Sequence, residues 1–126
     1  MENNAIWSHI LPTDLLKYFE IEKVEELKNA EGKMDIEITL SELNNIPSGY
    51  EKSDYESKGF MPSKRIQDFP IRGKAVYLNV KRRRWRHKVT KQEIQSDYNF
   101  IAEGAKLTEE LSDFLKVTGR DPRRYN

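Results

Sequence analysis

The sequence predicts an α+β fold in which antiparallel β-hairpins are flanked by a short N-terminal helix and a C-terminal helix. Apolar and polar residues alternate over 34–40 and again over 75–80, which is the two-residue period of half-buried strands. The clearest helical spacing of apolar residues lies near the two ends of the chain, over 15–19 and 107–115. Gly, Pro and Asn turn signals separate these segments. We expect antiparallel pairing throughout.

The composition is that of a single domain over residues 1–126. The length of 126 residues suffices for one modest core, and a charged fraction of 34% keeps that core small. The absence of Cys excludes disulfides and Cys-ligated zinc. No apolar run approaches the roughly 18 residues of a membrane span. The N-terminus has no signal-peptide pattern, so we expect a cytoplasmic protein with no membrane partner.

A near-neutral total charge hides a strong asymmetry between the two halves of the chain. Residues 1–63 contain 6 Lys, no Arg and 13 acidic residues, whereas residues 64–126 contain 16 Lys or Arg and 8 acidic residues. Such asymmetry favours an anionic partner for the basic half. The alternative is that the two halves fold together and neutralise each other.

The acidic half predicts one short helix, one hairpin and a long loop. Pro-Thr-Asp at 12–14 supplies a helix start, and the apolar stripe that follows predicts two or three turns at most. A turn signal over 30–33 joins two predicted strands, 19–28 and 33–41. Residues 42–63 are rich in Asn, Ser, Gly and Pro, which predicts a long internal loop.

The basic half predicts a short strand stopped by Pro70 and, after a turn at Gly73, a central strand. On that strand, Val76, Leu78 and Val80 face one way, while Ala75, Tyr77 and Asn79 face the other.

Residues 81–91, KRRRWRHKVTK, follow with seven Lys or Arg and no acid. Continued alternation would place Arg82 and Arg84 on the face of Val80, and Arg83 and Trp85 on the other. Charge on an apolar face indicates that the strand has passed its core or has bulged. We expect the arginines to face solvent and Trp85 to pack against the domain. His87 is expected in an exposed turn before a partner strand near 92–96.

The C-terminal part predicts a capped helix. Thr108 is a good N-cap residue, and Leu111, Phe114 and Leu115 follow at helical spacing. Gly119 is expected to end the helix, which leaves 119–126 as an exposed tail.

The basic block has the chemistry of a nucleic-acid contact. Cations that neutralise DNA phosphates release counterions, and Arg offers a bidentate fork to phosphates or guanine edges. A two-stranded β-ribbon also fits the major groove. We expect phosphate contacts from Lys74, Arg82, Arg84, Lys88 and Lys91, and base contacts from Arg83 and Arg86. Plain solvated surface is the competing interpretation of this block.

Enzyme chemistry finds little support, and we expect no catalytic residue, no cofactor and no metal. His9 and His87 are the two histidines of the chain, and Gly73 and Gly104 are isolated rather than part of a phosphate loop. Neighbouring acids such as 25–26 point apart in a strand, as do 109–110 in a helix.

Two stretches, RIQDFPIRGKAVYLNVKRRRW and DYNFIAEGAKLTEELSDFL, resemble the N-terminal region of ISAon-type insertion-sequence transposases. The resemblance covers nearly the whole chain and is most specific over 65–85. It implies a module that binds double-stranded DNA at the terminal repeats of a mobile element. It also implies that strand cleavage belongs to a later catalytic domain. The positions that carry over are Arg72, Lys74, Lys81, Arg82, Arg83, Arg84 and Trp85.

That group is in turn similar to transposases whose N-terminal region holds a zinc-binding ribbon. The corresponding loop here is 42–63 and the corresponding strand is 76–86, but the Cys ligands are missing. The resemblance therefore implies a metal-free, zinc-ribbon-like arrangement. Apolar packing would replace zinc ligation through Tyr50, Tyr55, Phe60, Met61 and Trp85.

Two rival interpretations remain open. In the first, the chain is a protein-interaction module, and its acidic hairpin pairs with the basic strand of another chain to form a homodimer or to dock a transposase catalytic subunit. In the second it is a small hydrolase or nuclease, for which no clustered site is evident.

Overall fold

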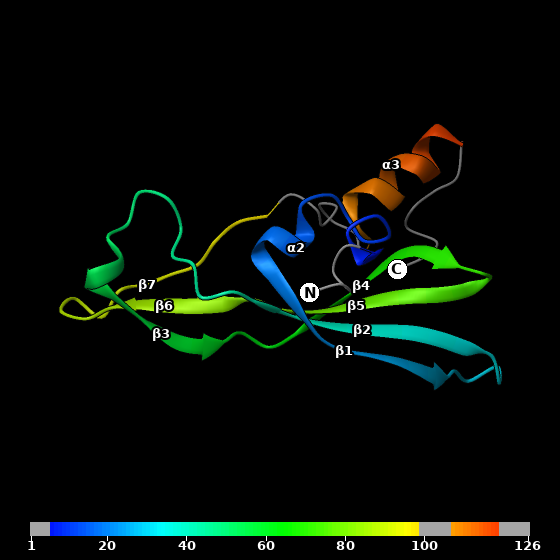
Figure 1. Cartoon of the computed structure of the whole chain (residues 1–126), viewed down its shortest axis with the longest axis horizontal. Coiled ribbons are helices and arrows are strands. Elements are labelled where there is room, and N and C mark those ends of the chain that lie inside the picture. The colour runs from blue at the N-terminus through cyan, green and yellow to red at the C-terminus, as the bar shows by residue number, and fades with distance from the viewer. Residues whose placement is uncertain (1–5, 99–106, 119–126) are drawn as a thin grey trace.

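The computed structural model describes residues 6–98 and 107–118, and its fold is α+β with mostly β-structure (Figure 1). The helices are α2 (Leu15–Tyr18) and α3 (Glu109–Val117), with a 3₁₀ turn at Lys52–Asp54. The strands are β1 (Phe19–Lys28), β2 (Met34–Glu42), β3 (Tyr55–Phe60), β4 (Lys64–Ile71), β5 (Lys74–Lys81), β6 (Arg83–His87) and β7 (Glu93–Ile94). Among these described residues, no helix is long and apolar enough to cross a membrane.

Four strands form the large sheet, in the order β1-β2-β5-β4. The β1–β2 and β4–β5 hairpins are antiparallel, as expected, but β2 and β5 are parallel, so the expectation of antiparallel pairing throughout is wrong. After β2 the chain travels out through residues 43–54 and comes back through β3 and then β4, so β5 enters the sheet in the direction of β2 (Figure 1). The register sets Ile38 beside Leu78 and Leu40 beside Val80, which joins two apolar rows.

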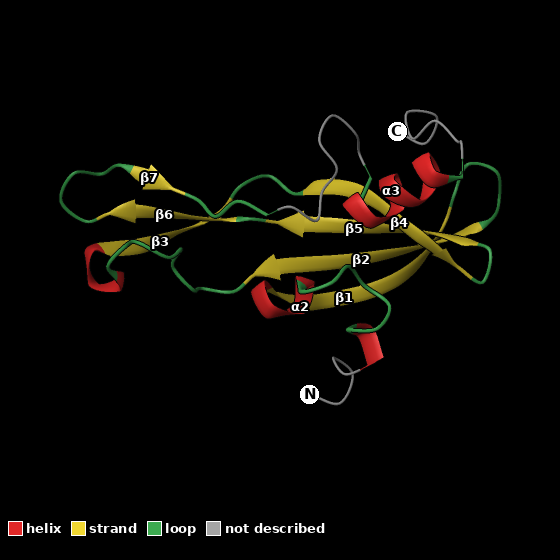
Figure 2. Cartoon of the chain, turned by 90° about the horizontal axis from the view of Figure 1, so that it is seen from above, coloured by secondary structure: helices red, strands yellow, loops and turns green. Residues whose placement is uncertain are grey.

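Three strands form the small sheet, in the antiparallel order β3-β6-β7. It lies beyond the large sheet along the long axis, because β6 follows β5 after one interrupting residue, Arg82 (Figures 1 and 2). The prediction of a long internal loop over 42–63 is therefore partly wrong, since the 3₁₀ turn and β3 lie within that stretch. The partner strand expected near 92–96 is confirmed as β7.

The main core lies on one face of the large sheet. The alternation predicted for β5 is confirmed, because Val76, Leu78 and Val80 are buried while the residues between them are half-buried. They pack with Ile66, three residues of β2, Leu15 of α2, Phe19 of β1 and Leu11, which precedes α2. Burying each such side chain contributes about 1.5–3 kcal/mol.

Both helices lie on the same side of the large sheet (Figure 1). The first is shorter than expected: α2 is a single turn, and Asp14 takes a left-handed φ of 68° without capping it. The predicted cap of α3 is confirmed, since the side chain of Thr108 accepts a hydrogen bond from the backbone N–H of Leu111. The end of α3 at Gly119 and the tail at 119–126 lie outside the described residues.

A small second cluster attaches α3 to β4. Leu107, Leu111 and Leu115 are buried against Phe69. The hydroxyl of Thr108 also donates a hydrogen bond to the buried carboxylate of Asp68 at 2.9 Å. Helix α3 therefore covers the β4 side of the large sheet through both apolar and polar contacts.

Candidate nucleic-acid interface

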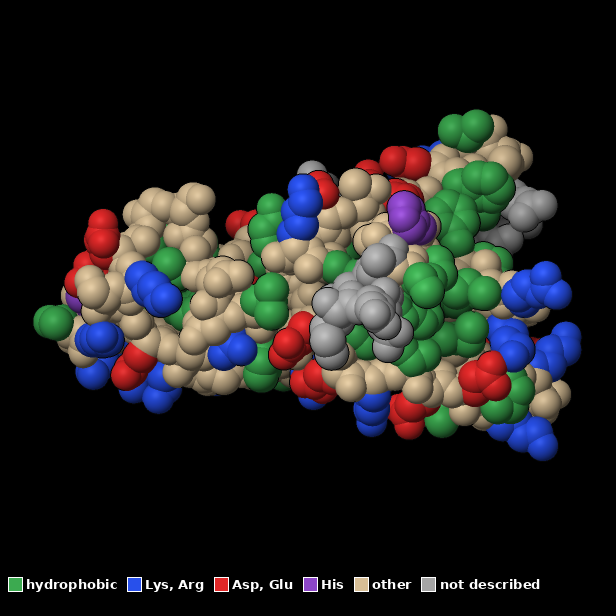
Figure 3. Space-filling view, viewed as in Figure 1, with side chains coloured by type: hydrophobic (Ala, Val, Ile, Leu, Met, Phe, Trp, Pro, Cys, Tyr) green, Lys and Arg blue, Asp and Glu red, His purple; other side chains and the backbone are tan. Residues whose placement is uncertain are grey.

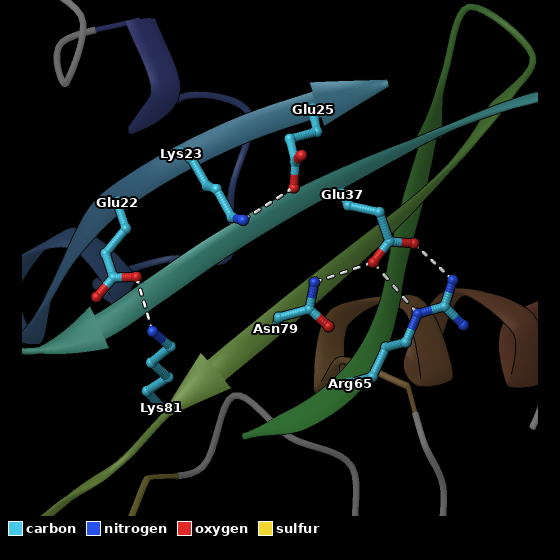
Figure 4. A network of polar contacts seen from close by, with 7 residues as sticks. All are labelled: Glu22, Lys23, Glu25, Glu37, Arg65, Asn79 and Lys81. Carbon is cyan, nitrogen blue, oxygen red and sulfur yellow. Dashed lines mark hydrogen bonds and ion pairs between the residues drawn. The ribbon is translucent and has the colours of Figure 1, made fainter. Parts of the chain in front are cut away.

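The face of the large sheet opposite the core is polar, and charged and polar side chains there form hydrogen bonds and ion pairs with one another (Figure 4). The carboxylate of Glu37 accepts hydrogen bonds from Arg65 at 2.5 and 3.3 Å and from Asn79 at 2.9 Å. The guanidinium of Arg65 lies 3.5 Å from the ring centroid of Tyr77. Burial of Glu37 acts to raise its pKa, but the bonds from Arg65 and Asn79 outweigh burial and the net shift is downward.

Two cations of β5 that the sequence assigned to DNA contact are paired with acids of β1. Lys74 donates to Glu26 at 2.6 Å, and Lys81 donates to Glu22 at 2.9 Å. Each pair reaches across β2, which separates the two strands. At these positions the acidic and basic halves neutralise each other within one chain, as one of the two sequence interpretations predicted.

Arg82 and Arg83 lie at the junction of the two sheets and turn inward, so the expectation that they face solvent is wrong. Arg82 donates to the carbonyl of Ser96 and lies 3.7 Å from a carboxylate oxygen of Asp97. Arg83 donates to the hydroxyl of Ser57 at 2.7 Å and lies over the ring of Phe60. Both guanidiniums are therefore engaged in holding the junction.

The carboxylate of Glu42 is the buried centre of this junction, with 2% of the residue exposed. It accepts hydrogen bonds from the backbone N–H of Arg83 at 2.8 Å and from the hydroxyl of Tyr98. Burial, and then the bond to Glu42, raise the pKa of the Tyr98 hydroxyl.

Trp85 is packed inside the small-sheet region, which confirms the expectation from sequence. Its exposed fraction is 2%, and its indole Nε1 donates to the side-chain oxygen of Asn44 at 2.9 Å. The interruption at Arg82 shifts the alternation by one residue, so Trp85 rather than Arg84 continues the buried row. Trp85 therefore supports the small sheet and is not available for stacking on a base.

The small sheet and its loop carry a group of cations, called the basic face below, in which Arg86 is half-buried and the others are exposed: Lys58, Arg84, Arg86, Lys88 and Lys91. Arg84 and Arg86 are two residues apart on β6 and therefore share a side of the sheet. Side-chain exposure is 44% for Arg84 and 30% for Arg86. In Figure 3, several Lys and Arg side chains lie at the end of the molecule that this sheet forms, and others lie at the opposite end.

Two carboxylates partly offset the basic face. Arg86 donates to Glu56 at 3.2 Å, and Arg84 lies 3.8 Å from Glu93. The bond from Arg86 lowers the pKa of Glu56, and the charges of Lys58 and Lys91 lower it further. Several cations thus lie around the carboxylate of Glu56, and the net charge of the basic face with its two paired carboxylates stays positive.

Sequence reasoning missed Lys58 because it treated 42–63 as loop. The available signal was weak: Tyr55 and Ser57 alternate with Glu56 and Lys58, and Gly59 breaks the pattern, with a φ of +83°. Pairing of β3 with β6 sets Glu56 opposite Arg86, and the charges of both Arg86 and Lys58 act on that carboxylate.

Arg72 lies apart from the basic face, in the β4–β5 turn. Its φ of 54° is left-handed, and Gly73 beside it has a φ of 78°. This turn is at the opposite end of the molecule from the small sheet (Figure 1). The structure therefore does not gather Arg72 with Arg84, Arg86, Lys88 and Lys91, although sequence reasoning grouped all of them.

The β6–β7 loop, residues 88–92, is tied down by hydrogen bonds. The Nδ1 atom of His87 accepts from the backbone N–H groups of Val89 and Thr90, each at 3.1 Å. The backbone N–H of His87 donates to the carbonyl of Gln92 at 2.8 Å. His87 is half-buried at the end of β6, so it organises this turn instead of lying exposed within it.

Across 6–98 and 107–118, no group of three or more His, Cys, Asp or Glu side chains could hold a metal ion. No protein-family model, no curated protein and no solved structure matches the chain. The fold and the site together define an α+β protein with two consecutive sheets and a basic face on the smaller one.

Proposed function

We propose that this protein binds double-stranded DNA through the basic face, as the N-terminal module of a transposase. It recognises the terminal repeats of a mobile element and does not itself cleave a strand. The observation that carries the proposal is the basic face, a group of five cations on the small sheet and its loop in which only Arg84 and Arg86 are paired with the carboxylates of Glu93 and Glu56 among the ion pairs of the described residues.

Phosphate binding explains the composition of this face. DNA presents closely spaced negative charges, and each contacted phosphate releases counterions, which drives association at low salt. Arg84 and Arg86 each present a planar fork that suits phosphate oxygens. Their partners, Glu93 and Glu56, are themselves half-exposed, so a phosphate can replace them at small cost.

The proposal includes a metal-free counterpart of the zinc ribbon. Part of the stretch that the resemblance assigns to the ribbon lies in the small sheet, since β3 falls within 42–63 and β6 covers the end of 76–86, whereas 76–81 belongs to β5 of the large sheet. Aromatic packing supports the small sheet. The rings of Tyr50 and Tyr55 lie 5.5 Å apart, those of Tyr55 and His87 lie 5.0 Å apart, and Trp85 is buried two residues before His87 on β6. Phe60 lies under Arg83, and Met61 follows it with its N–H bonded to Arg82.

A chelator tests this part of the proposal. Thermal unfolding in the presence of excess EDTA is expected to match unfolding without it, because packing rather than a metal ion holds the small sheet. A lower melting temperature with EDTA, restored by added zinc, would contradict the metal-free arrangement.

The rival role, homodimerisation or docking of a transposase catalytic subunit, has less support. It requires the acids of the hairpin and the cations of the central strand to be available to another chain. Glu26 and Lys74, and likewise Glu22 and Lys81, already pair within this chain. The basic face, by contrast, keeps an excess of charge for an external anion.

A charge-matched pair of variants tests DNA binding. The first replaces Arg84, Arg86, Lys88 and Lys91 with Gln. The second removes the same number of charges elsewhere, at Lys28, Lys33, Lys64 and Lys116, all exposed. Fluorescence anisotropy with a random-sequence duplex pool gives the affinity of each across a salt series.

The first variant is expected to lose most of its affinity, and its log–log salt slope should become shallower by about 0.9 per lost phosphate contact. The second should stay close to the unmodified protein. Equal losses in the two variants would indicate an effect of net charge alone and would overturn the assignment of the basic face. Retention of full affinity by the first variant would do the same.

A further inference from the structure

An exposed valine occupies the outermost end of the small sheet. Val89 lies in the β6–β7 loop and is 82% exposed. Figure 1 shows this loop at the end of the molecule farthest from α3, and Figure 3 shows hydrophobic atoms at the outermost point there, with Lys and Arg side chains beside them. A single exposed apolar residue is ordinary on a protein surface. Two features distinguish Val89 from other exposed apolar residues: its loop is held by hydrogen bonds, and cations flank it.

The loop that carries Val89 is preorganised. The two bonds to Nδ1 of His87 fix the backbone N–H groups of Val89 and Thr90. At the start of the loop, the backbone N–H of Lys88 donates to the carbonyl of Asp54 at 2.8 Å. A loop already held in one shape loses little conformational entropy when it docks, so it can present an apolar side chain to a partner efficiently.

Cations flank the apolar tip. Lys88 and Lys91 lie on either side of Val89 in the loop, and the Nζ atom of Lys91 donates to the carbonyl of Lys88 at 2.9 Å. Arg84 and Arg86 continue the charge along β6. The partner that fits is a polyanion with a recessed apolar feature. One valine is too little apolar surface to anchor a loop in a membrane, which takes larger side chains over a wider face.

The dimensions of duplex DNA select one groove. The major groove is about 12 Å wide and admits a two-stranded β-ribbon, whereas the minor groove is about 6 Å wide. Inside the major groove, the C5-methyl group of thymine is the apolar feature that a short aliphatic side chain can contact. We propose that the β6–β7 loop enters the major groove and that Val89 contacts thymine methyl groups there. This inference rests on the proposed function for its ligand, duplex DNA.

Replacement of thymine by uracil tests the contact, because it removes only the C5-methyl group. Random-sequence duplex pools made with either dT or dU are compared for the unmodified protein, for Val89→Ala and for Val117→Ala. Val117 is the matched control, since it is 86% exposed at the end of α3, on a different element. Thermal unfolding checks that each variant is folded.

The unmodified protein and Val117→Ala should bind the dU pool about threefold to fivefold more weakly than the dT pool, the effect of one or so buried methyl groups. Val89→Ala should bind the dT pool more weakly by a similar factor and should no longer distinguish the two pools. The decisive quantity is the interaction free energy between the two changes, Val89→Ala in the protein and dT→dU in the DNA, obtained from the four affinities.

Failure of this inference can be told apart from failure of DNA binding. Equal affinity of the unmodified protein for both pools overturns the thymine contact, and the salt-dependent loss in the basic-face variant would then still stand. Discrimination that persists in Val89→Ala overturns the role of Val89. Binding to phosphatidylserine vesicles that depends on Val89, without discrimination between the pools, assigns the loop to a membrane instead. No binding to any duplex overturns the proposed function itself.

Discussion

Glu42 and Arg83 bind each other twice. The backbone N–H of Arg83 donates to the carboxylate of Glu42 at 2.8 Å, and the Nε atom of Arg83 donates to the backbone carbonyl of Glu42 at 3.2 Å. Glu42 ends β2 and Arg83 begins β6, so these two bonds join the large sheet to the small one. The orientation of the basic face relative to the core depends on this connection.

Glu42→Ala is expected to destabilise the fold by about 2–4 kcal/mol, because it removes the buried carboxylate that accepts from the N–H of Arg83 and from the hydroxyl of Tyr98. Urea unfolding measures the change. Glu20→Ala on the exposed part of β1 is the control and should stay within about 0.5 kcal/mol. Equal stability of the two variants would show that the junction does not depend on Glu42.

Adjacent arginines are expected to behave oppositely. Arg83→Gln should lower the free energy of unfolding by about 1–3 kcal/mol, because it breaks the bonds to Glu42 and Ser57. Arg84→Gln should leave stability nearly unchanged and weaken duplex binding, because Arg84 is exposed with one distant carboxylate. Urea unfolding and anisotropy on both proteins check this. A loss of stability in Arg84→Gln as large as that in Arg83→Gln would contradict these roles.

Trp85→Phe should destabilise the small sheet by about 1–3 kcal/mol, because it removes the hydrogen bond from the indole to Asn44 and leaves a small cavity where Trp85 is buried. Trp85 and Trp7 are the two tryptophans of the chain, so the variant also simplifies the fluorescence signal. Thermal unfolding followed by circular dichroism gives the stability. If the variant bound DNA more weakly while its stability was unchanged, Trp85 would have a direct role in binding.

Asp68 is expected to make stability fall as the pH rises. Burial raises the pKa of its carboxyl group, although the hydrogen bond from Thr108 acts in the opposite direction. Since the folded pKa lies above the unfolded value of about 3.9, this contribution is fully present below that pH and is lost as the pH rises through the folded pKa.

Asp68→Asn keeps an acceptor for Thr108 without the charge. It should therefore be more stable than the unmodified protein at neutral pH, and the advantage should disappear in acid. Urea unfolding across a pH series checks this. An advantage that is independent of pH would rule out titration of Asp68 as its cause.

Elements with a strong local pattern could be predicted from sequence. The hairpin of β1 and β2 has a clear turn signal and alternation, and α3 has Thr108 as its cap. Strand β3 was missed because its six residues hold a glycine and only a short alternation. Parallel pairing of β2 with β5 was also missed, because it depends on the route of the chain between the two strands and not on either local pattern.

The candidate site divides in the same way. The run of Lys and Arg in the sequence indicated a cluster of cations near Trp85. The large apolar surface of an indole favours burial, which predicted that Trp85 would pack against the domain. Which arginines remain exposed depended on the interruption at Arg82, where one residue shifts every following side chain to the other face.

The amino-acid sequence by itself determined the α+β class, the strands with strict alternation, the capped helix and the concentration of positive charge in the second half, because each of these depends on neighbours along the chain. Tertiary structure alone decided which charges are neutralised. Glu22 and Glu26 reach Lys81 and Lys74 only because β2 pairs with both of their strands, and Glu56 reaches Arg86 only because β3 pairs with β6. Charge pairing acts over a few ångströms in space, and distance along the chain does not specify it.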